Sequence, residues 1–294
     1  MMYSHKDYER NPFLATREIG RELNGGSLTL FLGAGVSSGF GLPDWPTLVA
    51  RILGRGSDAS YVGELHTKND TDLARLIDAV DDGTEAYVDK VHGALYSDVP
   101  SILTDHLSRS PLLLSVGAMM TGACRGRITS VITYNYDDLL IQYLNMLGYS
   151  VSRRKQYNDL STWADVEINY VHGYVPQGRT GASRPEDLIL SERSYREKRA
   201  KIDEEWSSFI VHSLYSKIGL FLGLSGEDGS ILDLLARARR EIKRTTGYYG
   251  YWLMTPTSFD RNQKPILDVQ MCPIKLDKND LPKFVLQICQ NALP

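Results

Sequence analysis

The sequence has few cysteines and little net charge, and it lacks a long apolar run. Its three cysteines, Cys124, Cys272 and Cys289, lie far apart, so they form neither a disulfide framework nor a Cys-x-x-Cys metal pair. No apolar segment approaches the ~20 residues of a membrane-spanning helix. The 33 basic and 36 acidic residues give a net charge of −3, which offers no general sign of a nucleic-acid-binding surface.

The amino-terminal stretch is also poor in apolar residues. Residues 1–13 are polar and lack the apolar core of a signal peptide. These absences together predict a cytoplasmic protein that binds neither a membrane nor nucleic acid directly.

Apolar residues make up 42% of the 294 residues, enough to form a sizeable core. Short apolar runs rich in β-branched residues alternate with helical patterns along most of the chain. We expect strands at 28–32, 127–133, 167–171, 218–222, 248–254 and near 269–274, and helices at 11–23, 46–53, 137–147, 194–216, 230–243 and 281–293. This alternation predicts a single α/β domain over 1–294, with a Rossmann-like, doubly wound and mostly parallel sheet.

Residues 57–125 differ from the rest of the chain. Charged helical segments follow one another there without a clear strand, at 72–80, 84–96, 101–107 and 112–121. We expect this range to form a helical insertion or cap.

Glycine and small polar residues follow four of the expected strands. In parallel sheets, ligands bind outside the carboxyl ends of the strands, so residues at these positions converge. The four stretches are 33–39 (GAGVSSG), 134–138 (YNYDD), 172–173 (HG) and 223–230 (GLSGEDGS). Their convergence is stronger support for a ligand site than any one of them alone.

The first of these loops suits a phosphate, because glycines let backbone N–H groups approach an anion. Its spacing is G-x-G-x-x-x-G, however, one residue longer than the dinucleotide fingerprint. The acidic residue expected about 20 residues later has no strand to occupy. The loop alone is therefore compatible with either a nucleotide site or a tight structural turn.

Asn135 and His172 are the two candidates for chemistry. Asn135 and the two aspartates after it, Asp137 and Asp138, could simply cap a helix, which position alone favours. Alternatively, the Asn135 amide could hold ribose hydroxyls or a water. A lone histidine is more often structural than catalytic, but His172 is the one histidine at a predicted strand end beside a glycine, and it could accept a proton.

Taken in order, these stretches resemble the motifs of the sirtuin (silent-information-regulator-like) superfamily. Sirtuins carry a Gly-Ala-Gly-x-Ser loop ending in Gly-Ile-Pro-Asp-Phe-Arg, then Thr-Gln-Asn-Ile-Asp, and then a catalytic His-Gly. The corresponding stretches here are 33–37 (GAGVS) with 41–45 (GLPDW), 133–137 (TYNYD), 172–173 (HG) and 223–225 (GLS). The resemblance covers roughly residues 28–230.

Several departures from the sirtuin pattern bear on function. Sirtuin deacylases hold zinc through two Cys-x-x-Cys pairs after the His-Gly, whereas this chain has no cysteine between His172 and Cys272. Trp45 replaces the Phe, and Pro46 replaces the Arg, of Pro-Asp-Phe-Arg. These losses are similar to those in the zinc-less, sirtuin-like NADases of bacterial antiphage defence systems.

The resemblance implies an NAD+ hydrolase that depletes NAD in infected cells (abortive infection), with NAD as the substrate and no metal. It implies roles in catalysis for Asn135 and His172, and in NAD binding for Gly33, Ala34, Gly35, Ser37, Asp44, Trp45, Thr133, Asp137, Gly223 and Ser225. The glycine loop would cradle the pyrophosphate, Asp44 and Trp45 would border the nicotinamide, and Ser225 would contact the adenosine ribose.

An unregulated NADase would kill its host, so we expect a gate. The analogy implies a homo-oligomer and a partner protein encoded nearby, an ATPase or nuclease such as a HerA-like ATPase. Two other functions stay open: an NAD-dependent protein deacylase, against which the missing cysteines argue, and a non-catalytic sensor of NAD or an ADP-ribose derivative. Retention of both Asn135 and His172 argues against the sensor.

Overall fold

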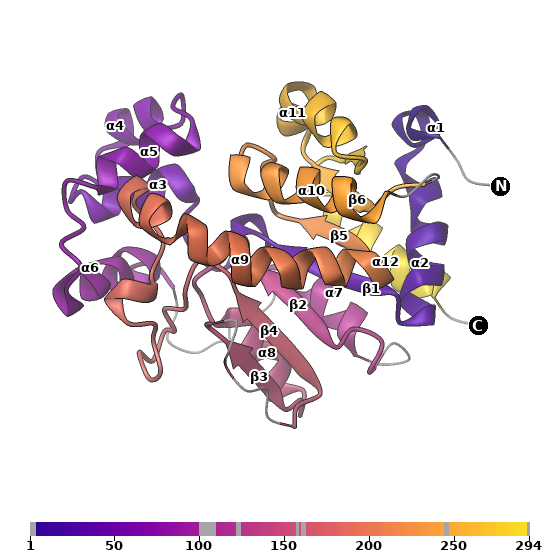
Figure 1. The fold of residues 1–294 in the computed structure, drawn as a ribbon, viewed down its shortest axis with the longest axis horizontal. Helices are drawn as coiled ribbons and strands as arrows, with labels where there is room; N and C mark the ends of the chain where they lie inside the picture. The colour runs from indigo at the N-terminus through magenta and orange to yellow at the C-terminus, as the bar shows by residue number, and fades with distance from the viewer. Residues whose placement is uncertain are drawn as a thin grey trace.

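The computed structural model describes residues 4–99, 110–121, 125–156, 159, 163–243 and 247–292. Its centre is one seven-stranded sheet in the order β3-β4-β2-β1-β5-β6-β7, in which all neighbouring strands are parallel (Figure 1). The strands are β1 (Leu28–Leu32), β2 (Ser130–Thr133), β3 (Val151–Arg154), β4 (Val166–Tyr170), β5 (Ile218–Leu222), β6 (Gly250–Met254) and β7 (Cys272–Lys275). The predicted Rossmann-like α/β class is confirmed.

Helices lie between most consecutive strands and cover both faces of the sheet. They are α1 (His5–Arg10), α2 (Ala15–Gly25), α3 (Trp45–Ile52), α4 (Ala59–Leu65), α5 (Asp70–Ile77), α6 (Glu85–Tyr96), α7 (Pro111–Met120), α8 (Leu139–Met146), α9 (Glu192–Ser216), α10 (Gly229–Ile242), α11 (Pro256–Asp268) and α12 (Leu281–Asn291). No helix among the described residues is both long and apolar enough to cross a membrane.

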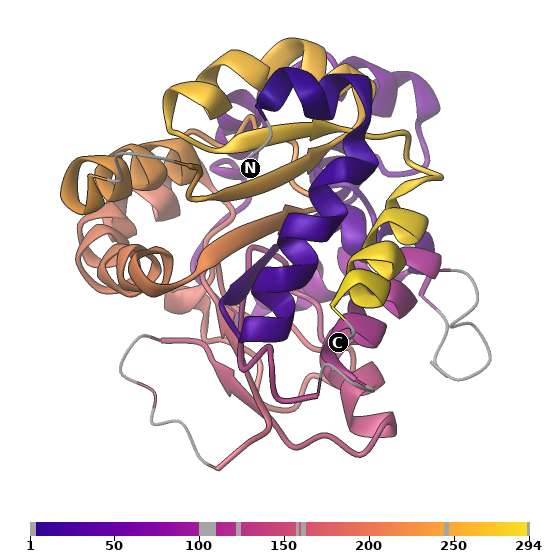
Figure 2. The same ribbon diagram turned by 90° about the vertical axis from the view of Figure 1, so that its right-hand side faces the viewer.

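The two faces of the sheet form two separate apolar clusters, because successive side chains of a strand point to opposite faces. In β1, Leu28, Leu30 and Leu32 pack with α2, α7, α8 and α12, and α2 lies beside α12 (Figure 2). Phe31 points the other way, toward the face covered by α9, α10 and α11. There it stacks on Phe221, its register partner in β5, with ring centroids 4.1 Å apart.

The strand order reverses direction between β1 and β5. Strands β2, β3 and β4 lie on one side of β1, and the chain then crosses to β5 on the other side. A crevice for a ligand is expected at such a switch point, outside the carboxyl ends of the two strands. The loops after β1 and β5, residues 33–39 and 223–228, therefore meet where a dinucleotide would bind.

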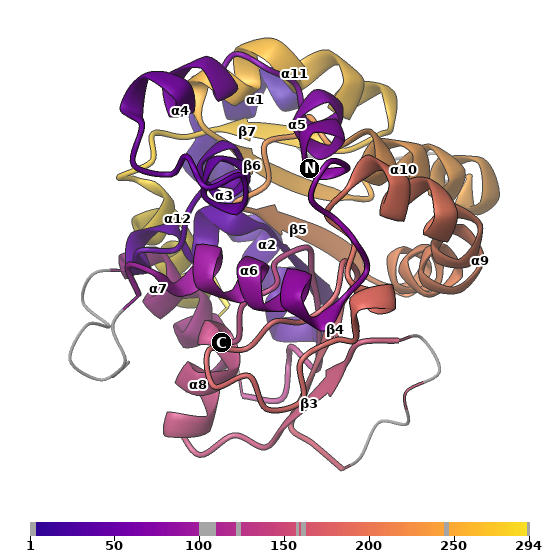
Figure 3. The ribbon, with the colours of Figure 1, turned by 90° about the vertical axis from the view of Figure 1, so that its left-hand side faces the viewer.

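Helices α3, α4, α5 and α6 gather at one end of the molecule, away from the two termini (Figure 1; Figure 3 views this end). Hydrogen bonds attach this group to the start of α9. The Ser191 hydroxyl donates to Asp81 over 2.5 Å, and the Arg193 N–H donates to Asp78 over 2.8 Å. Helix α7 lies elsewhere and packs against α12. The described part of the range 57–125 thus contains a group of helices at one end of the sheet, α4 to α6, and helix α7, which covers a sheet face.

Some elements were not expected from the sequence. Strand β3 is an edge strand with two arginines, which lacks the apolar run of a buried strand. Helix α11 contains Pro265, which weakens a helical pattern, and α1 and α4 are short. The helix expected at 101–107 lies outside the described residues, as does Cys124. Cys272 is a buried free thiol, and Cys289 is partly exposed.

Candidate active site

The loops after β1 and β5 touch backbone to backbone. The Gly33 N–H donates to the Leu222 carbonyl over 2.9 Å, and the Gly35 N–H donates to the Gly223 carbonyl over 3.0 Å. A Cβ on Gly35 would lie 2.8 Å from the Gly223 Cα, and Gly223 itself has φ of +70°. Glycine is required at these positions because no side chain fits between the loops. The pyrophosphate cradle at Gly33, Ala34 and Gly35 stays a prediction.

Asn135 is attached to the loop after β1. Its side-chain Nδ2 donates to the Gly33 carbonyl over 3.2 Å and lies 3.4 Å from the Ser37 hydroxyl, while its backbone N–H donates to the Thr133 hydroxyl over 3.1 Å. Among the described residues, no group donates to the Asn135 Oδ1. The amide is thus held by its nitrogen, and its oxygen remains available to accept a hydrogen bond from a ligand.

Asp137 joins the same network from a buried position. Its Oδ1 accepts from the Ser37 hydroxyl over 3.2 Å and from the Leu139 N–H over 3.1 Å, at the start of α8. Burial raises the pKa of Asp137 from 3.8 to about 6, although the Leu139 N–H acts in the opposite direction. Asp138 is the N-cap residue of α8, but its side chain makes no capping hydrogen bond; Asp137, one residue earlier, binds the first N–H of the helix instead and also fixes the loop that carries Asn135.

His172 follows β4 and packs against Tyr134, which follows β2. The two rings meet edge to face, with centroids 5.2 Å apart and planes at 81°. Burial lowers the pKa of His172 below its ordinary 6.5, and the negative charge of Asp228 partly opposes this shift. The imidazole is thus mainly neutral at pH 7 and able to accept a proton.

The turn after His172 depends on Gly173. Its φ of +104° is one that other residues rarely adopt, and a Cβ there would lie 3.0 Å from the Asp187 carbonyl oxygen. The His172 carbonyl accepts from the Ile189 N–H over 2.9 Å, so the histidine backbone is fixed from both sides.

Two carboxylates near the site were not predicted from the sequence. Asp228 lies in the loop between β5 and α10, and its charge affects His172, Tyr134 and Tyr136. Asp70 begins α5, where burial together with the charges of Asp228 and Glu227 raises its pKa to about 6. Nothing in the sequence indicates that Asp70, on a helix, lies near Asp228, in a loop.

The comparison with protein families agrees with this arrangement. Residues 129–271 match the model of the SIR2-like domain. This match assigns the region 129–271 to the sirtuin-like superfamily. SIR2-like domains bind NAD, and the matched region of this sirtuin-like chain carries Asn135, His172 and Gly223. No curated protein matches the chain.

Three predicted NAD-binding residues of the sirtuin-like chain lie apart from this hydrogen-bonded network. Asp44 caps α3 by accepting from the Thr47 N–H over 3.0 Å, and Trp45 begins that helix. The Ser225 hydroxyl accepts from the Glu227 N–H over 3.2 Å. Within the described residues, no hydrogen bond links these three to Asn135 or Asp137, so their contacts with NAD stay predictions.

The described residues contain no group of three or more His, Cys, Asp or Glu side chains that could hold a metal ion.

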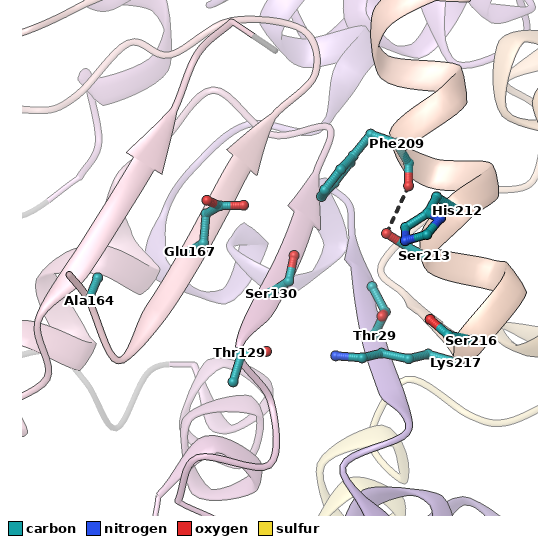
Figure 4. A pocket seen from close by; sticks show the side chains of 10 residues that line it. All are labelled: Thr29, Thr129, Ser130, Ala164, Glu167, Phe209, His212, Ser213, Ser216 and Lys217. Carbon is teal, nitrogen blue, oxygen red and sulfur yellow. Dashed lines mark hydrogen bonds between the residues drawn. The ribbon is translucent and has the colours of Figure 1, made fainter. Parts of the chain in front are cut away.

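A separate pocket of about 380 Å³ lies at the opposite, amino-terminal edge of the sheet. Its floor is formed by Thr29, Ser130 and Glu167 of β1, β2 and β4, and α9 covers it with Phe209 and His212 (Figure 4). Ligands of doubly wound sheets bind at the carboxyl edge instead, where Asn135 and His172 lie. We therefore take the carboxyl edge as the candidate active site.

Proposed function

We propose that this protein is an NAD+ glycohydrolase, which cleaves NAD+ to nicotinamide and ADP-ribose. The observation that carries the proposal is the placement of a neutral, half-buried His172 and a fixed Asn135 at the carboxyl edge of a SIR2-like sheet. A helix cap does not describe Asn135, because its side chain binds the loop after β1 and not the first N–H groups of α8.

In the proposed reaction, the bond between ribose C1′ and the nicotinamide nitrogen breaks. Its electron pair leaves with the nicotinamide, which becomes neutral and needs little help from an acid. The ribose passes through an oxocarbenium-like state, as in glycoside cleavage. Water then forms a bond to C1′ and loses its proton to His172, a general-base step that contributes typically about 10²–10⁴-fold.

Asn135 would position the water or the ribose through its side-chain oxygen. Its Nδ2 donates to the Gly33 carbonyl and lies 3.4 Å from the Ser37 hydroxyl. These contacts fix the plane of the amide before the substrate binds. Asp137 supports the same loop through Ser37 and would act as a positioning residue.

A protein deacylase is the main competing function for a sirtuin-like chain. Against it stands the lack of Cys-x-x-Cys pairs, which leaves the zinc module of sirtuin deacylases without its four thiolate ligands. A non-catalytic NAD sensor is the other alternative, but binding alone does not require a neutral histidine beside the site.

We further propose that the activity serves antiphage defence by depleting NAD, and that a partner protein and a homo-oligomer control it. Helices α4, α5 and α6, which we call the cap helices, are the candidate gate. Asp78 and Asp81, which follow α5, accept hydrogen bonds from residues at the start of α9 and so attach the cap helices to that helix. Light scattering tests the oligomer: we expect a species larger than one chain, and a strictly monomeric protein with full activity contradicts this part.

One experiment separates the three functions. The protein is incubated with NAD+, with and without an acyl-lysine peptide, and the products are identified by chromatography. A glycohydrolase releases nicotinamide and ADP-ribose in both samples, a deacylase releases nicotinamide only with the peptide, and a sensor consumes no NAD+. Because a gated enzyme can be latent, the incubation is repeated with the candidate partner ATPase or nuclease.

A further inference from the structure

Tyr134 lies directly at the carboxyl end of β2, next to Asn135. Its backbone N–H donates to the Leu32 carbonyl of β1 over 2.9 Å, which continues the sheet by one residue. Its side chain belongs to the apolar cluster beneath α9 and is only 9% exposed. The ring is therefore fixed by the sheet and by packing, and the position of its hydroxyl is well defined.

The Tyr134 hydroxyl is buried and has no hydrogen-bond partner among the described residues. Buried polar groups almost always have a partner, so such an exception needs an explanation. Nearby tyrosines follow the rule: Tyr136 donates to the Ile189 carbonyl over 2.6 Å, and Tyr170 donates to the Asp137 carbonyl over 2.9 Å. A partner from outside the chain would remove the exception.

The surroundings of the hydroxyl indicate what that partner is. The ring is in edge-to-face contact with His172, and the negative charge of Asp228 acts on the hydroxyl. Burial first, and then Asp228, raise the pKa of Tyr134 well above its ordinary value, so the phenol keeps its proton and can donate.

A phenol donor is complementary to a ligand hydroxyl, which can accept its hydrogen bond. The negative charge of Asp228 makes this position poorly suited to a phosphate, which the charge would repel. In a bound dinucleotide, the groups of this kind are the ribose hydroxyls. The ribose beside His172 would be the one on the nicotinamide side, because its C1′ is the reacting atom in the proposed hydrolysis.

We propose that the Tyr134 hydroxyl donates a hydrogen bond to a hydroxyl of the nicotinamide-side ribose. This inference rests on the proposed function for the identity of the ligand. The inference adds Tyr134 to the NAD-binding residues. It also explains why a ring that packs in an apolar cluster carries a hydroxyl group.

The test is Tyr134→Phe, which removes one oxygen and keeps the ring. Binding is measured by calorimetry with ADP-ribose, which has the second ribose, and with ADP, which lacks it. We expect an about tenfold rise in Kd for ADP-ribose, equivalent to about 1.4 kcal/mol, and no change for ADP. The thermal unfolding midpoint of the free protein should stay the same or rise, because no hydrogen bond within the protein is lost.

Tyr149→Phe is the matched control. Its hydroxyl is also buried, but it donates to the Met120 carbonyl over 2.6 Å, far from the site in the fold. This variant should lower the unfolding midpoint and leave both Kd values unchanged. The pair separates a hydroxyl that binds ligand from one that stabilises the fold.

Several results would overturn the inference. An unchanged Kd of Tyr134→Phe for ADP-ribose would contradict it. So would an equal loss of affinity for ADP and ADP-ribose. A lowered unfolding midpoint with unchanged binding would show instead that the hydroxyl stabilises the fold. If NAD+ is hydrolysed but Tyr134→Phe binds normally, only this inference fails. If wild type binds ADP-ribose through Tyr134 but cleaves no NAD+ even with its partner, only the proposed function fails.

Discussion

Gly35 donates its backbone N–H to the carbonyl of Gly223, 3.0 Å away, and thereby closes the loop after β1 against the loop after β5. The two residues are 188 positions apart in the sequence. Their contact sets the width of the switch-point crevice, because neither loop can move toward the other. The glycines of the first loop are thus explained partly by the second loop.

Replacing Gly35 by alanine should destabilise the protein. The new Cβ would lie 2.8 Å from the Gly223 Cα, a backbone atom that cannot simply rotate away. Overpacking of this kind costs typically about 1–3 kcal/mol. Urea denaturation of Gly35→Ala measures the loss, with Gly178→Ala as the control, since a Cβ on Gly178 meets nothing within 4 Å. Equal stability of the two variants would show that the loops are not in contact.

Replacing His172 or Asn135 by alanine should nearly abolish the release of nicotinamide. A lost general base lowers the rate by typically about 10²–10⁴-fold. His212→Ala is the control, because His212 lies on α9 at the opposite edge of the sheet. Circular dichroism shows whether each variant is folded. A folded Asn135→Ala that releases nicotinamide at the wild-type rate would remove Asn135 from the mechanism.

The pKa of His172 should lie below 6.5 and should fall further in Asp228→Asn. Burial disfavours the charged imidazole, and the Asp228 carboxylate favours it, so removing that charge lowers the pKa again. NMR titration of the histidine rings measures both values, with His172→Ala used to assign the signal. A pKa that rises in Asp228→Asn, or does not move, contradicts the placement of Asp228 near His172.

Asp137→Asn should stabilise the protein at neutral pH. The pKa of Asp137 is raised from 3.8 to about 6, so the folded state keeps a proton that the unfolded state loses, and the stability of the wild type falls as pH rises through that window. The shift corresponds to about 3 kcal/mol. An asparagine keeps an acceptor for Ser37 and Leu139 without the charge.

The measurement is the free energy of unfolding of both proteins between about pH 4 and pH 7. The advantage of Asp137→Asn should be small at the lower limit, grow up to about pH 6 and then remain constant. A difference that is independent of pH would show that Asp137 titrates normally in the folded protein.

Much of the fold could be predicted because buried parallel strands are short apolar runs that alternate with helices. β1 and β5 lie where the sequence predicts them, at Leu28–Leu32 and Ile218–Leu222. The edge strand β3 could not be predicted, because it pairs with β4 alone and carries Arg153 and Arg154 in place of apolar residues.

Only those residues of the candidate site that belong to a sequence motif could be predicted. Asn135 and His172 follow strands, so their common edge follows from the parallel sheet. The charges of Asp70 on α5 and Asp228 in the β5–α10 loop act on one another, and no local sequence pattern signals this proximity. The unpartnered hydroxyl of Tyr134 is likewise a property of its surroundings in three dimensions.

The proposed activity is tested most directly by incubating the wild-type protein, alone and with its candidate partner, with NAD+ and no acyl peptide. Nicotinamide and ADP-ribose are then quantified by chromatography, beside the double variant Asn135→Ala/His172→Ala. We predict that wild type forms the two products in equal amounts and that the double variant forms neither above background. NAD+ that remains intact under every condition, or equal turnover by the double variant, would contradict the proposal.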